Sequence, residues 1–326
     1  MNYSLERALK NRSWYWNRLK SPYRLLDDMG IHVIDYFAPY LATANPARKL
    51  FCSQRFGRVG FWCRHHEDFV VQWGKCTLKD LNLNFPLRHL PYAMLDAYYF
   101  SNRENYVFRN VNGKIYMDIE DRVFHIPFPY GIYELLEVYR DQCYRHIKAS
   151  GTVVDVGAFI GDTAVYFASQ GAKRVVAFEP ARQLYQYAID NVKLNHLDNT
   201  VEVHNCAIGT RKGEAKFFYN PNWPGLSSLD EGRFEAQIQN VVVVSLADVI
   251  RDVGNVELLK LDCEGAEYQL LPHLHETGVI SRVQNVILEV HGSKQPILGI
   301  LKHDGYKIVH VDESGPNPLV SASRNP

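Results

Sequence analysis

Short runs of Val, Ile and Leu recur at regular intervals after Gly151, and helical stretches separate them. The runs are Thr152–Val156, Arg174–Phe178, Val201–Asn205, Glu257–Asp262 and Val283–Val290, with weaker ones at Tyr306–Val311 and Leu319–Ala322. Runs that are apolar on both faces are typical of buried parallel strands. Seven strands with helical crossovers predict a doubly wound α/β sheet for this half of the chain.

Helices are expected between these strands. Asp162–Gln170 follows the first run, and Pro180–Asn195 follows the second. In the second helix, five residues recur at helical spacing, namely Leu184, Tyr187, Ala188, Asn191 and Leu194. Two further segments, Lys212–Tyr219 and Val241–Leu246, predict an additional strand pair around a loop, Asn220–Gln239. This loop, which contains Trp223, Ser227 and Ser228, is long enough to have a function of its own.

The chain before Gly151 is rich in Tyr, Trp, Phe and Arg at irregular spacing. Tyr106–Val111 and Lys114–Ile119, joined by Asn112-Gly113, predict a hairpin with a type I′ turn. Tyr133–Ala149 predicts a helix that leads into the α/β half, and the first residues are expected to be helical. A chain of 326 residues is long enough for two parts. We therefore predict an N-terminal accessory and substrate-recognition region, residues 1–122, and a catalytic domain, residues 123–326.

Charge, cysteine content and the apolar stretches indicate the kind of partner and the cellular compartment. Lys and Arg together number 36, as do Asp and Glu, and this balance disfavours a nucleic-acid partner. The six cysteines lack paired CxxC spacing and predict free thiols in a reducing compartment. The first twenty residues lack the apolar core of a secretory signal, and no stretch reaches the ~18 apolar residues of a membrane span. We expect a cytoplasmic protein, with peripheral membrane contact and oligomeric state left open.

The strongest local signal is a turn between the first strand and the first helix. Val156 is followed by Gly157 and Gly161, and the next helix begins near Asp162. Glycine is required where a Cβ would collide or where φ is positive. A dinucleotide fingerprint, G-x-G-x-x-G, would place glycine where this chain has Asp155. A carboxylate there repels a pyrophosphate but attracts the ammonium group of a methionine moiety.

Glu179 is the acidic partner of this turn. It ends the second strand, roughly 20 positions beyond the turn, where a carboxylate can accept hydrogen bonds from ribose hydroxyls. Asp155 and Glu179 together favour a nucleoside that carries an amino acid. The alternative is that the glycines only make a tight turn while both carboxylates cap helices.

Five sequence blocks occur in the order typical of one family. They are Val153-Val154-Asp155-Val156-Gly157-Ala158-Phe159-Ile160-Gly161, Val176-Ala177-Phe178-Glu179-Pro180, Asn205-Cys206-Ala207-Ile208-Gly209, Leu259-Lys260-Leu261-Asp262-Cys263-Glu264-Gly265-Ala266-Glu267 and Ile287-Leu288-Glu289-Val290-His291. In these blocks the chain resembles the FkbM family of methyltransferases over roughly residues 130–292, and the Asp-x-Glu-Gly-x-Glu block is the most distinctive. Phe159 departs from the family pattern, which usually has Asn.

The resemblance implies a Rossmann-like class I methyltransferase fold, with a seven-stranded sheet whose last hairpin is reversed. It implies S-adenosylmethionine as cofactor and methyl transfer to hydroxyl oxygens of sugars, glycolipids or other hydroxylated metabolites. The acceptor is thus expected to be a small molecule or a glycan. By position, the methionine end would be held by Asp155, Gly157 and Gly161 with neighbouring Ala158 and Asp162, the ribose by Glu179 with Pro180, and the adenine edge by Cys206 and Ala207.

Catalytic side chains are expected where the fourth and fifth strands end, because ligands of open α/β sheets bind beyond the carboxyl ends of the strands. Asp262, Glu264, Glu267 and His291 lie there. His291 is the best candidate for a general base, because an unperturbed imidazole titrates near neutral pH. Asp262 or Glu264 would either replace or orient it, and Asp262 would also face the cofactor. Glu267 is expected to be structural.

Three alternatives remain at this point. Asp262, Glu264 and His291 suit a divalent cation, but the spacing does not favour a metal over metal-free catalysis. An NAD-linked oxidoreductase is disfavoured by Asp155 in place of the first fingerprint glycine. A non-catalytic subunit built on a methyltransferase core is the third alternative, and the retained Asp262, Glu264 and His291 argue against it.

Overall fold

The structure, a computed structural model, describes residues 106–127, 131–220, 227–229, 237–313 and 317–324, and three earlier strands. The chain divides into two compact units, one of Met1–Arg103 with Phe108–Gly113, the other of Glu104–Val107 with Lys114–Pro326. In the first unit the three earlier strands, β1 (Phe69–Gln72), β2 (Lys75–Leu78) and β3 (Leu83–Pro86), form an antiparallel sheet. The helices expected near the N-terminus lie outside the described residues. The division predicted at residue 122 stays a prediction.

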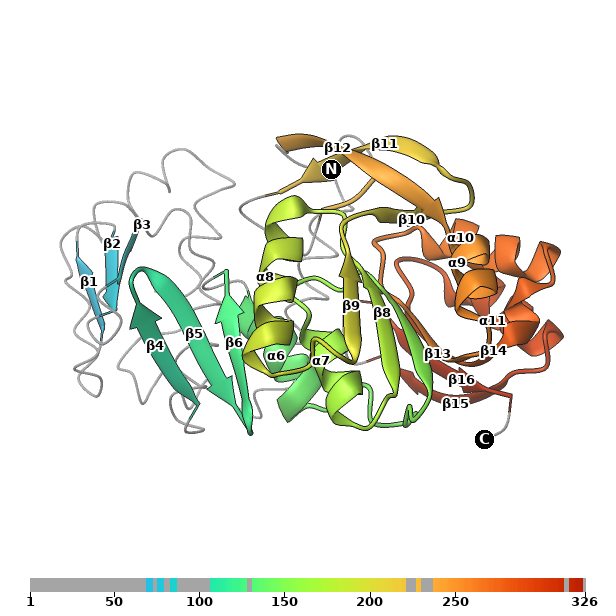
Figure 1. Cartoon of the computed structure of the whole chain (residues 1–326), viewed down its shortest axis with the longest axis horizontal. Helices are drawn as coiled ribbons and strands as arrows, with labels where there is room; N and C mark the ends of the chain where they lie inside the picture. Colours follow the sequence, from blue (N-terminus) through green and yellow to red (C-terminus); the bar gives the residue numbers. More distant parts are fainter. Residues whose placement is uncertain are drawn as a thin grey trace, which may run out of the picture. The chain divides into compact units, whose positions relative to one another are not determined.

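The second unit contains the predicted seven-stranded sheet (Figure 1). Its strands are β7 (Thr152–Val156), β8 (Arg174–Phe178), β9 (Val201–His204), β13 (Val256–Leu261), β14 (Val283–Glu289), β15 (Lys307–Asp312) and β16 (Leu319–Ser323). They lie in the order β15-β16-β14-β13-β7-β8-β9. Neighbours from β9 to β14 are parallel, whereas β16 is antiparallel to both β14 and β15. The prediction of a Rossmann-like class I sheet with a reversed last hairpin is confirmed.

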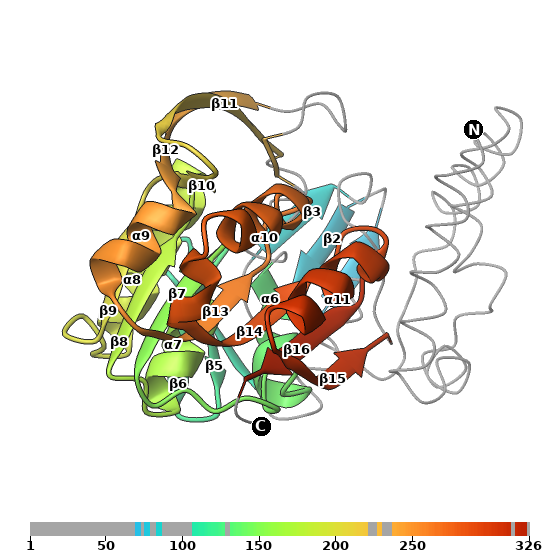
Figure 2. The same cartoon turned by 90° about the vertical axis from the view of Figure 1, so that its right-hand side faces the viewer.

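Helices cover both faces of this sheet (Figures 1 and 2). On one face lie α7 (Asp162–Ser169) and α8 (Arg182–Leu194), and on the other lie α9 (Leu246–Val253), α10 (Glu267–Glu276) and α11 (Lys294–His303). Double coverage explains why the inner strands are buried on both faces and read as continuous apolar runs. In α8 the predicted stripe is buried at Leu184, Ala188 and Asn191, but Leu194 is 39% exposed because the helix ends there. None of the described helices is long and apolar enough to cross a lipid bilayer.

The segment before the large sheet forms strands and one short helix. β4 (Val107–Val111) and β5 (Lys114–Ile119) flank Asn112 and Gly113, whose φ values of 54° and 83° fit the predicted type I′ turn. β6 (Arg122–Ile126) pairs with β5. Asn191 of α8 joins this strand to the glycine turn. Its side-chain amide donates to the carbonyl oxygens of His125 (3.0 Å) and Ile160 (2.8 Å), and its oxygen accepts from the His125 amide (2.6 Å).

The prediction of a helix over Tyr133–Ala149 is wrong beyond Arg140. The chain forms α6 (Gly131–Leu135) and one π-helical turn (Leu136–Arg140), then continues through turns. Gln142 has a left-handed φ of 49°, which a continuing right-handed helix does not allow. Helical spacing of apolar residues therefore did not mark the true end of the helix.

The additional strand pair is confirmed and belongs to a smaller sheet. β11 (Gly213–Tyr219) pairs antiparallel with β12 (Gln237–Ser245), and β10 (Ala207–Gly209) pairs parallel with β12 on its other side. Ser228, from the long loop between β11 and β12, exchanges backbone hydrogen bonds with Phe218. These bonds hold this part of the loop against β11. Trp223 lies outside the described residues.

Candidate functional site

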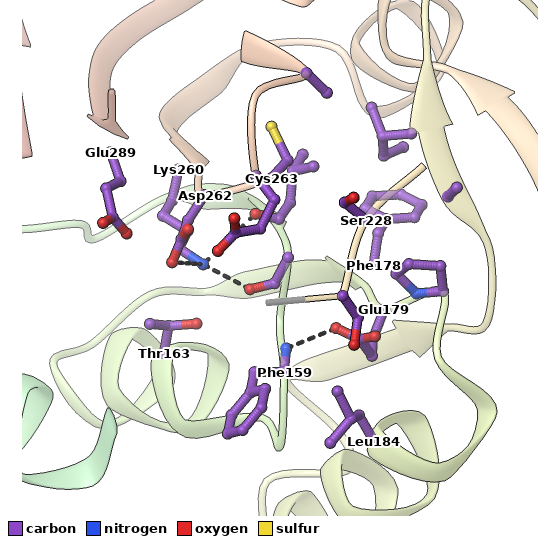
Figure 3. Close-up of a pocket in the computed structure, with 18 of the residues that line it drawn as sticks. Phe159, Thr163, Phe178, Glu179, Leu184, Ser228, Lys260, Asp262, Cys263 and Glu289 are labelled. Carbon is purple, nitrogen blue, oxygen red and sulfur yellow. Dashed lines mark hydrogen bonds and ion pairs between the residues drawn. The ribbon is translucent and has the colours of Figure 1, made fainter. Parts of the chain in front are cut away.

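A cavity of about 230 Å³ opens at the carboxyl ends of β7, β8, β13 and β14 (Figure 3). Among the described residues its lining includes seven carboxylates and one lysine: Glu134, Glu137, Asp162, Glu179, Asp262, Glu264, Glu289 and Lys260. Figure 3 shows Asp262 and Glu289 on one side, and Phe178 and Leu184 on the other. We call Asp262, Glu264 and Glu289 the acidic end, and Phe178 and Leu184 the apolar end.

The glycine turn forms the floor of this cavity. Gly157 has a φ of 81°, and a Cβ there would collide with the carbonyl oxygen of Asp262. Gly161 has the same φ, and a Cβ there would lie 3.1 Å from the Cα of Ala188. Both positions therefore require glycine. The amides of Gly157 and Ala158 donate to the carbonyl oxygen of Phe178, each at 3.0 Å, so the turn is bound to β8.

Asp155 lies beneath this floor and does not line the cavity. Its side chain is fully buried, and its Oδ2 accepts a hydrogen bond from the Thr163 hydroxyl at 2.6 Å. Its Oδ1 lies 3.3 Å from Nζ of Lys260. The ammonium that this carboxylate contacts is thus supplied by the protein. Ala158 and Gly161 also lie off the cavity lining, whereas Gly157 and Asp162 are part of it.

Lys260 has a central position that the sequence analysis missed. Its side chain is 2% exposed, and Nζ donates to the Gly157 carbonyl oxygen at 2.7 Å. Nζ also lies 3.6 Å from Oδ2 of Asp262, so the lysine links Asp155, the turn and the acidic end. Burial alone would lower the pKa of this amine, but the surrounding aspartates outweigh burial and raise it. A lysine inside an apolar strand run was the available signal, because buried lysines need anionic partners.

Glu179 is positioned as the sequence predicted, at the end of β8 and in the cavity lining. Its carboxylate accepts hydrogen bonds from the amides of Phe159 (3.0 Å) and Ala181 (2.8 Å). Burial raises the pKa of Glu179 to about 8, although both amides act in the opposite direction. Pro180, Cys206 and Ala207 also line the cavity. The residues predicted to bind ribose and adenine therefore lie together in the lining of one cavity.

Asp162 starts α7 and faces the same space. Burial raises its pKa to about 7, and Asp155 contributes in the same direction while Lys260 opposes it. Phe159 lines the cavity with a left-handed φ of 48°. Asn tolerates a left-handed φ better than Phe does. This explains why Asn is the usual family residue at the position of Phe159.

His291 lies behind the acidic end and does not line the cavity. Its side chain is 1% exposed, with Nδ1 3.2 Å from Oε1 of Glu267 and Nε2 3.5 Å from Oε1 of Glu264. Burial alone would lower the pKa of this ring, but the two carboxylates outweigh burial and raise it to about 11. A general base at neutral pH needs a pKa near 7. The environment of the ring does not suit the base role predicted for His291.

Glu267 has the structural role that was expected. It is fully buried at the start of α10, where Oε1 accepts from the His291 amide (2.8 Å) and Oε2 from the Gly265 amide (2.9 Å). Burial would raise the pKa of Glu267, but the bonds from His291 outweigh it and lower the pKa. These contacts fasten the segment after β13 to the end of β14.

Glu264 and Glu289 complete the acidic end. Glu264 has a left-handed φ of 52°, a conformation that costs a non-glycine residue roughly 1 kcal/mol or more and that clusters at functional sites. Glu289, the last residue of β14, accepts from the Asn317 side-chain amide at 2.8 Å. Burial, followed by the charge of Asp262, raises its pKa. From the sequence, Glu289 was named only within the fifth block and was given no role.

The predicted serines lie in the lining as well. Ser227 and Ser228 are buried, and the Ser227 hydroxyl accepts from the Asn220 amide at 2.9 Å. An apolar surface joined to an excess of carboxylates suits a ligand with a flat ring at one end and positive charge at the other.

Comparison with known proteins agrees with this geometry. Residues 155–308 match the Methyltransferase FkbM domain family. Methyltransferase sdnD of Sordaria araneosa is 28% identical over 210 residues, which cover 53% of this chain and 80% of the relative. Methyltransferase 1 of Beauveria bassiana is 27% identical over 182 residues, covering 48% and 72%.

A solved structure, Methyltransferase FkbM from Methylobacillus flagellatus KT, matches with a TM-score of 0.39 and 18% identity, over 62% of this chain and 55% of that one. The family match carries the assignment, since residues 155–308 include the turn, Glu179 and the Asp-x-Glu-Gly-x-Glu block. Residues 155–308 of the chain form a methyltransferase domain of the FkbM family.

Proposed function

We propose that the protein transfers a methyl group from S-adenosylmethionine to a hydroxyl oxygen of a sugar, glycolipid or other hydroxylated metabolite. The observation that carries this proposal is the two-ended cavity, with Glu179 near the apolar end and an excess of carboxylates at the other. S-adenosylmethionine has a matching division, with a nucleoside at one end and a sulfonium and an ammonium at the other.

The nucleoside is assigned to the apolar end. The ribose hydroxyls donate to Glu179, whose carboxylate is held by two backbone amides and faces the cavity. Adenine lies against Phe178 and Leu184, with its edge toward Cys206 and Ala207. The Asn205 side chain, which donates to the carbonyl oxygens of Glu179 (2.9 Å) and Pro180 (3.0 Å), fixes this border.

The methionine end is assigned to the neighbourhood of Gly157, Asp162 and Asp262. These residues line the cavity between Glu179 and the acidic end, and their carboxylates attract the two positive groups of the donor. Asp155 contributes through Lys260, which anchors the Gly157 carbonyl. This role differs from the direct contact that the sequence analysis predicted for Asp155.

Methyl transfer to a hydroxyl needs alignment and removal of one proton. The hydroxyl oxygen forms a bond to the methyl carbon while the carbon–sulfur bond breaks, and the electron pair of that bond remains on sulfur. We propose that the carboxylate of Glu264, which lines the cavity, accepts the proton of the acceptor hydroxyl. His291 positions this carboxylate from behind, at 3.5 Å.

The proposal also includes the cellular compartment of the protein and the class of acceptor molecule. The described cysteines Cys143, Cys206 and Cys263 carry free thiols, which suits the cytoplasm. The acceptor is a small molecule or a glycan rather than a nucleic acid, because the cavity lining is acidic and repels phosphate backbones.

Calorimetry on the chelator-treated protein tests the cofactor. S-adenosylhomocysteine should bind and NAD should not. Glu179→Ala should weaken binding at least tenfold, whereas Glu202→Ala, which removes a surface carboxylate paired with Arg174, should leave it unchanged. Binding of NAD without S-adenosylhomocysteine would refute the proposal.

Labelled methyl donor and a metabolite extract test the reaction. The labelled product should carry an O-methyl group by NMR, and Glu264→Gln should reduce its formation at least a hundredfold while keeping S-adenosylhomocysteine affinity. An N-methyl or C-methyl product would contradict the assignment to hydroxyl groups.

A further inference from the structure

We propose that Asp262, Glu289 and His291 bind a divalent cation at the acidic end of the cavity. The inference rests on the proposed function and deepens it, because the ion would hold the acceptor hydroxyl next to the methyl group. One potential ligand atom from each of these three side chains lies within 4.8 Å of the corresponding atoms of the other two.

The sheet brings these residues together. Asp262 follows β13 directly, Glu289 ends β14, and His291 lies two residues later. The two strands are parallel neighbours in register at Leu261 and Leu288. Their carboxyl ends therefore open at the same edge, where ligands of such sheets bind.

His291 is oriented as a metal-binding histidine usually is. Glu267 Oε1 holds its Nδ1 at 3.2 Å and accepts from its backbone amide at 2.8 Å. Nε2 is buried and has no hydrogen-bond partner among the described residues; Oε1 of Glu264 lies near it at 3.5 Å. A carboxylate on one ring nitrogen fixes the ring so that the other nitrogen can bind a metal. A bound ion would replace the proton at Nε2.

The carboxylates of Glu289 and Asp262 differ in their surroundings, because the first is held by a hydrogen bond and the second is exposed to the cavity. Asn317 holds one oxygen of Glu289 at 2.8 Å, which is the same kind of support that Glu267 gives His291. Asp262 is 31% exposed and lines the cavity. An ion bound here would have protein ligands on the buried side and open positions toward the cavity.

The ligand set identifies the class of ion. Two carboxylates and one imidazole suit Mn²⁺, Mg²⁺ or a similar divalent metal rather than a thiolate-preferring one. Ligand atoms about 2.1 Å from an ion stand about 3 to 4 Å apart, so small side-chain rotations complete the coordination. A metal-bound hydroxyl loses its proton more readily. Glu264, beside His291 Nε2, receives that proton.

Titration of the chelator-treated full-length protein with Mn²⁺, followed by calorimetry and electron paramagnetic resonance, tests the site. One equivalent should bind, and Asp262→Asn and Glu289→Gln should each weaken binding at least tenfold. Glu137→Gln removes the same charge from the same cavity without removing a ligand, so its Mn²⁺ affinity should stay within about threefold of the unchanged protein.

Equal losses in Glu137→Gln and Glu289→Gln would overturn the proposal, because they would show attraction to general negative charge. Absence of Mn²⁺ binding at millimolar concentration would overturn it as well. Anomalous diffraction from crystals soaked in Mn²⁺ tests the unchanged protein and should place the ion between the three side chains. Binding of S-adenosylhomocysteine to the metal-free protein is measured separately, so failure here is distinguishable from failure of the proposed function.

Discussion

Nζ of Lys260 lies 3.3 Å from Oδ1 of Asp155, and both side chains are buried, at 2% and 0% exposure. A buried ion pair contributes little net stability, but the loss of one partner leaves an uncompensated charge. This relationship holds the first and fourth strands of the methyltransferase core together just below the cavity floor.

Replacement of the lysine tests this coupling. Lys260→Met should lower the free energy of unfolding by about 3–5 kcal/mol, measured by urea denaturation. The double variant Asp155→Asn with Lys260→Met should lose less than the sum of the two single variants, because the charges disappear together. A loss below 1 kcal/mol for Lys260→Met would show that water or another group compensates Asp155.

Glu179 should make cofactor binding depend on pH. Its pKa in the free protein is about 8, and ribose hydroxyls donate to the ionised form. The Kd of S-adenosylhomocysteine should therefore fall by up to about tenfold per pH unit from pH 6 to 8 and level off above 8. Calorimetry in matched buffers checks this, and Glu179→Gln should remove the dependence. A flat profile in the unchanged protein would contradict it.

The same carboxyl should affect stability in the opposite direction. Its pKa in the folded state is above the usual 4.5, so the folded protein binds more protons than the unfolded chain between pH 4.5 and 8. Without ligand, the contribution of Glu179 is therefore most favourable below pH 4.5 and is lost as pH rises toward 8. Across this pH window, the melting temperature of the unchanged protein should fall more steeply with rising pH than that of Glu179→Gln.

Gly157 and Gly171 form a matched pair of glycines with positive φ, 81° and 107°. Gly171→Ala places a Cβ in open space, so only the backbone conformation opposes it, at about 1–2 kcal/mol. Gly157→Ala adds a collision with the Asp262 carbonyl and should cost well over 3 kcal/mol or prevent folding. Chemical denaturation of both variants separates the two effects, and similar losses would refute the packing explanation.

Asn191 is fully buried and bonds to both His125 and Ile160. Asn191→Ala should lower the free energy of unfolding by about 3 kcal/mol, since it leaves three backbone groups without partners. Asn195→Ala, which affects a half-buried asparagine bonded to Val123, should lose about 1 kcal/mol because water can replace it. Equal effects in urea denaturation would show that burial does not decide the cost.

The strands were predictable because burial on both faces imposes a local pattern. β7 and β8 begin and end at the predicted residues, and β9, β13 and β14 differ by one residue at one or both ends. The helix predicted to run to Ala149 failed because the left-handed Gln142 leaves no trace in apolar spacing. The position of Glu179 was predictable too, since it directly follows a strand whose carboxyl end opens at the cavity.

Side-chain roles that depend on distant partners were not predictable. Asp155 has the expected place on its strand, yet Lys260, more than a hundred residues later, determines what it contacts. His291 likewise lies at the expected strand end, but it is buried with the carboxylates of Glu264 and Glu267 near its two ring nitrogens, which does not suit the expected base role.

The placement of β16 between β14 and β15 has a consequence for the order of folding. β15 cannot join the sheet until β16, which comes later in the chain, has paired with β14. On the ribosome β15 therefore stays outside the sheet until residues 319–323 have emerged. Asn317 leads into that strand and holds Glu289, so one wall of the cavity takes its final form only with this last closure. Under the proposed function, a nascent chain would bind a nucleoside before it orients an acceptor.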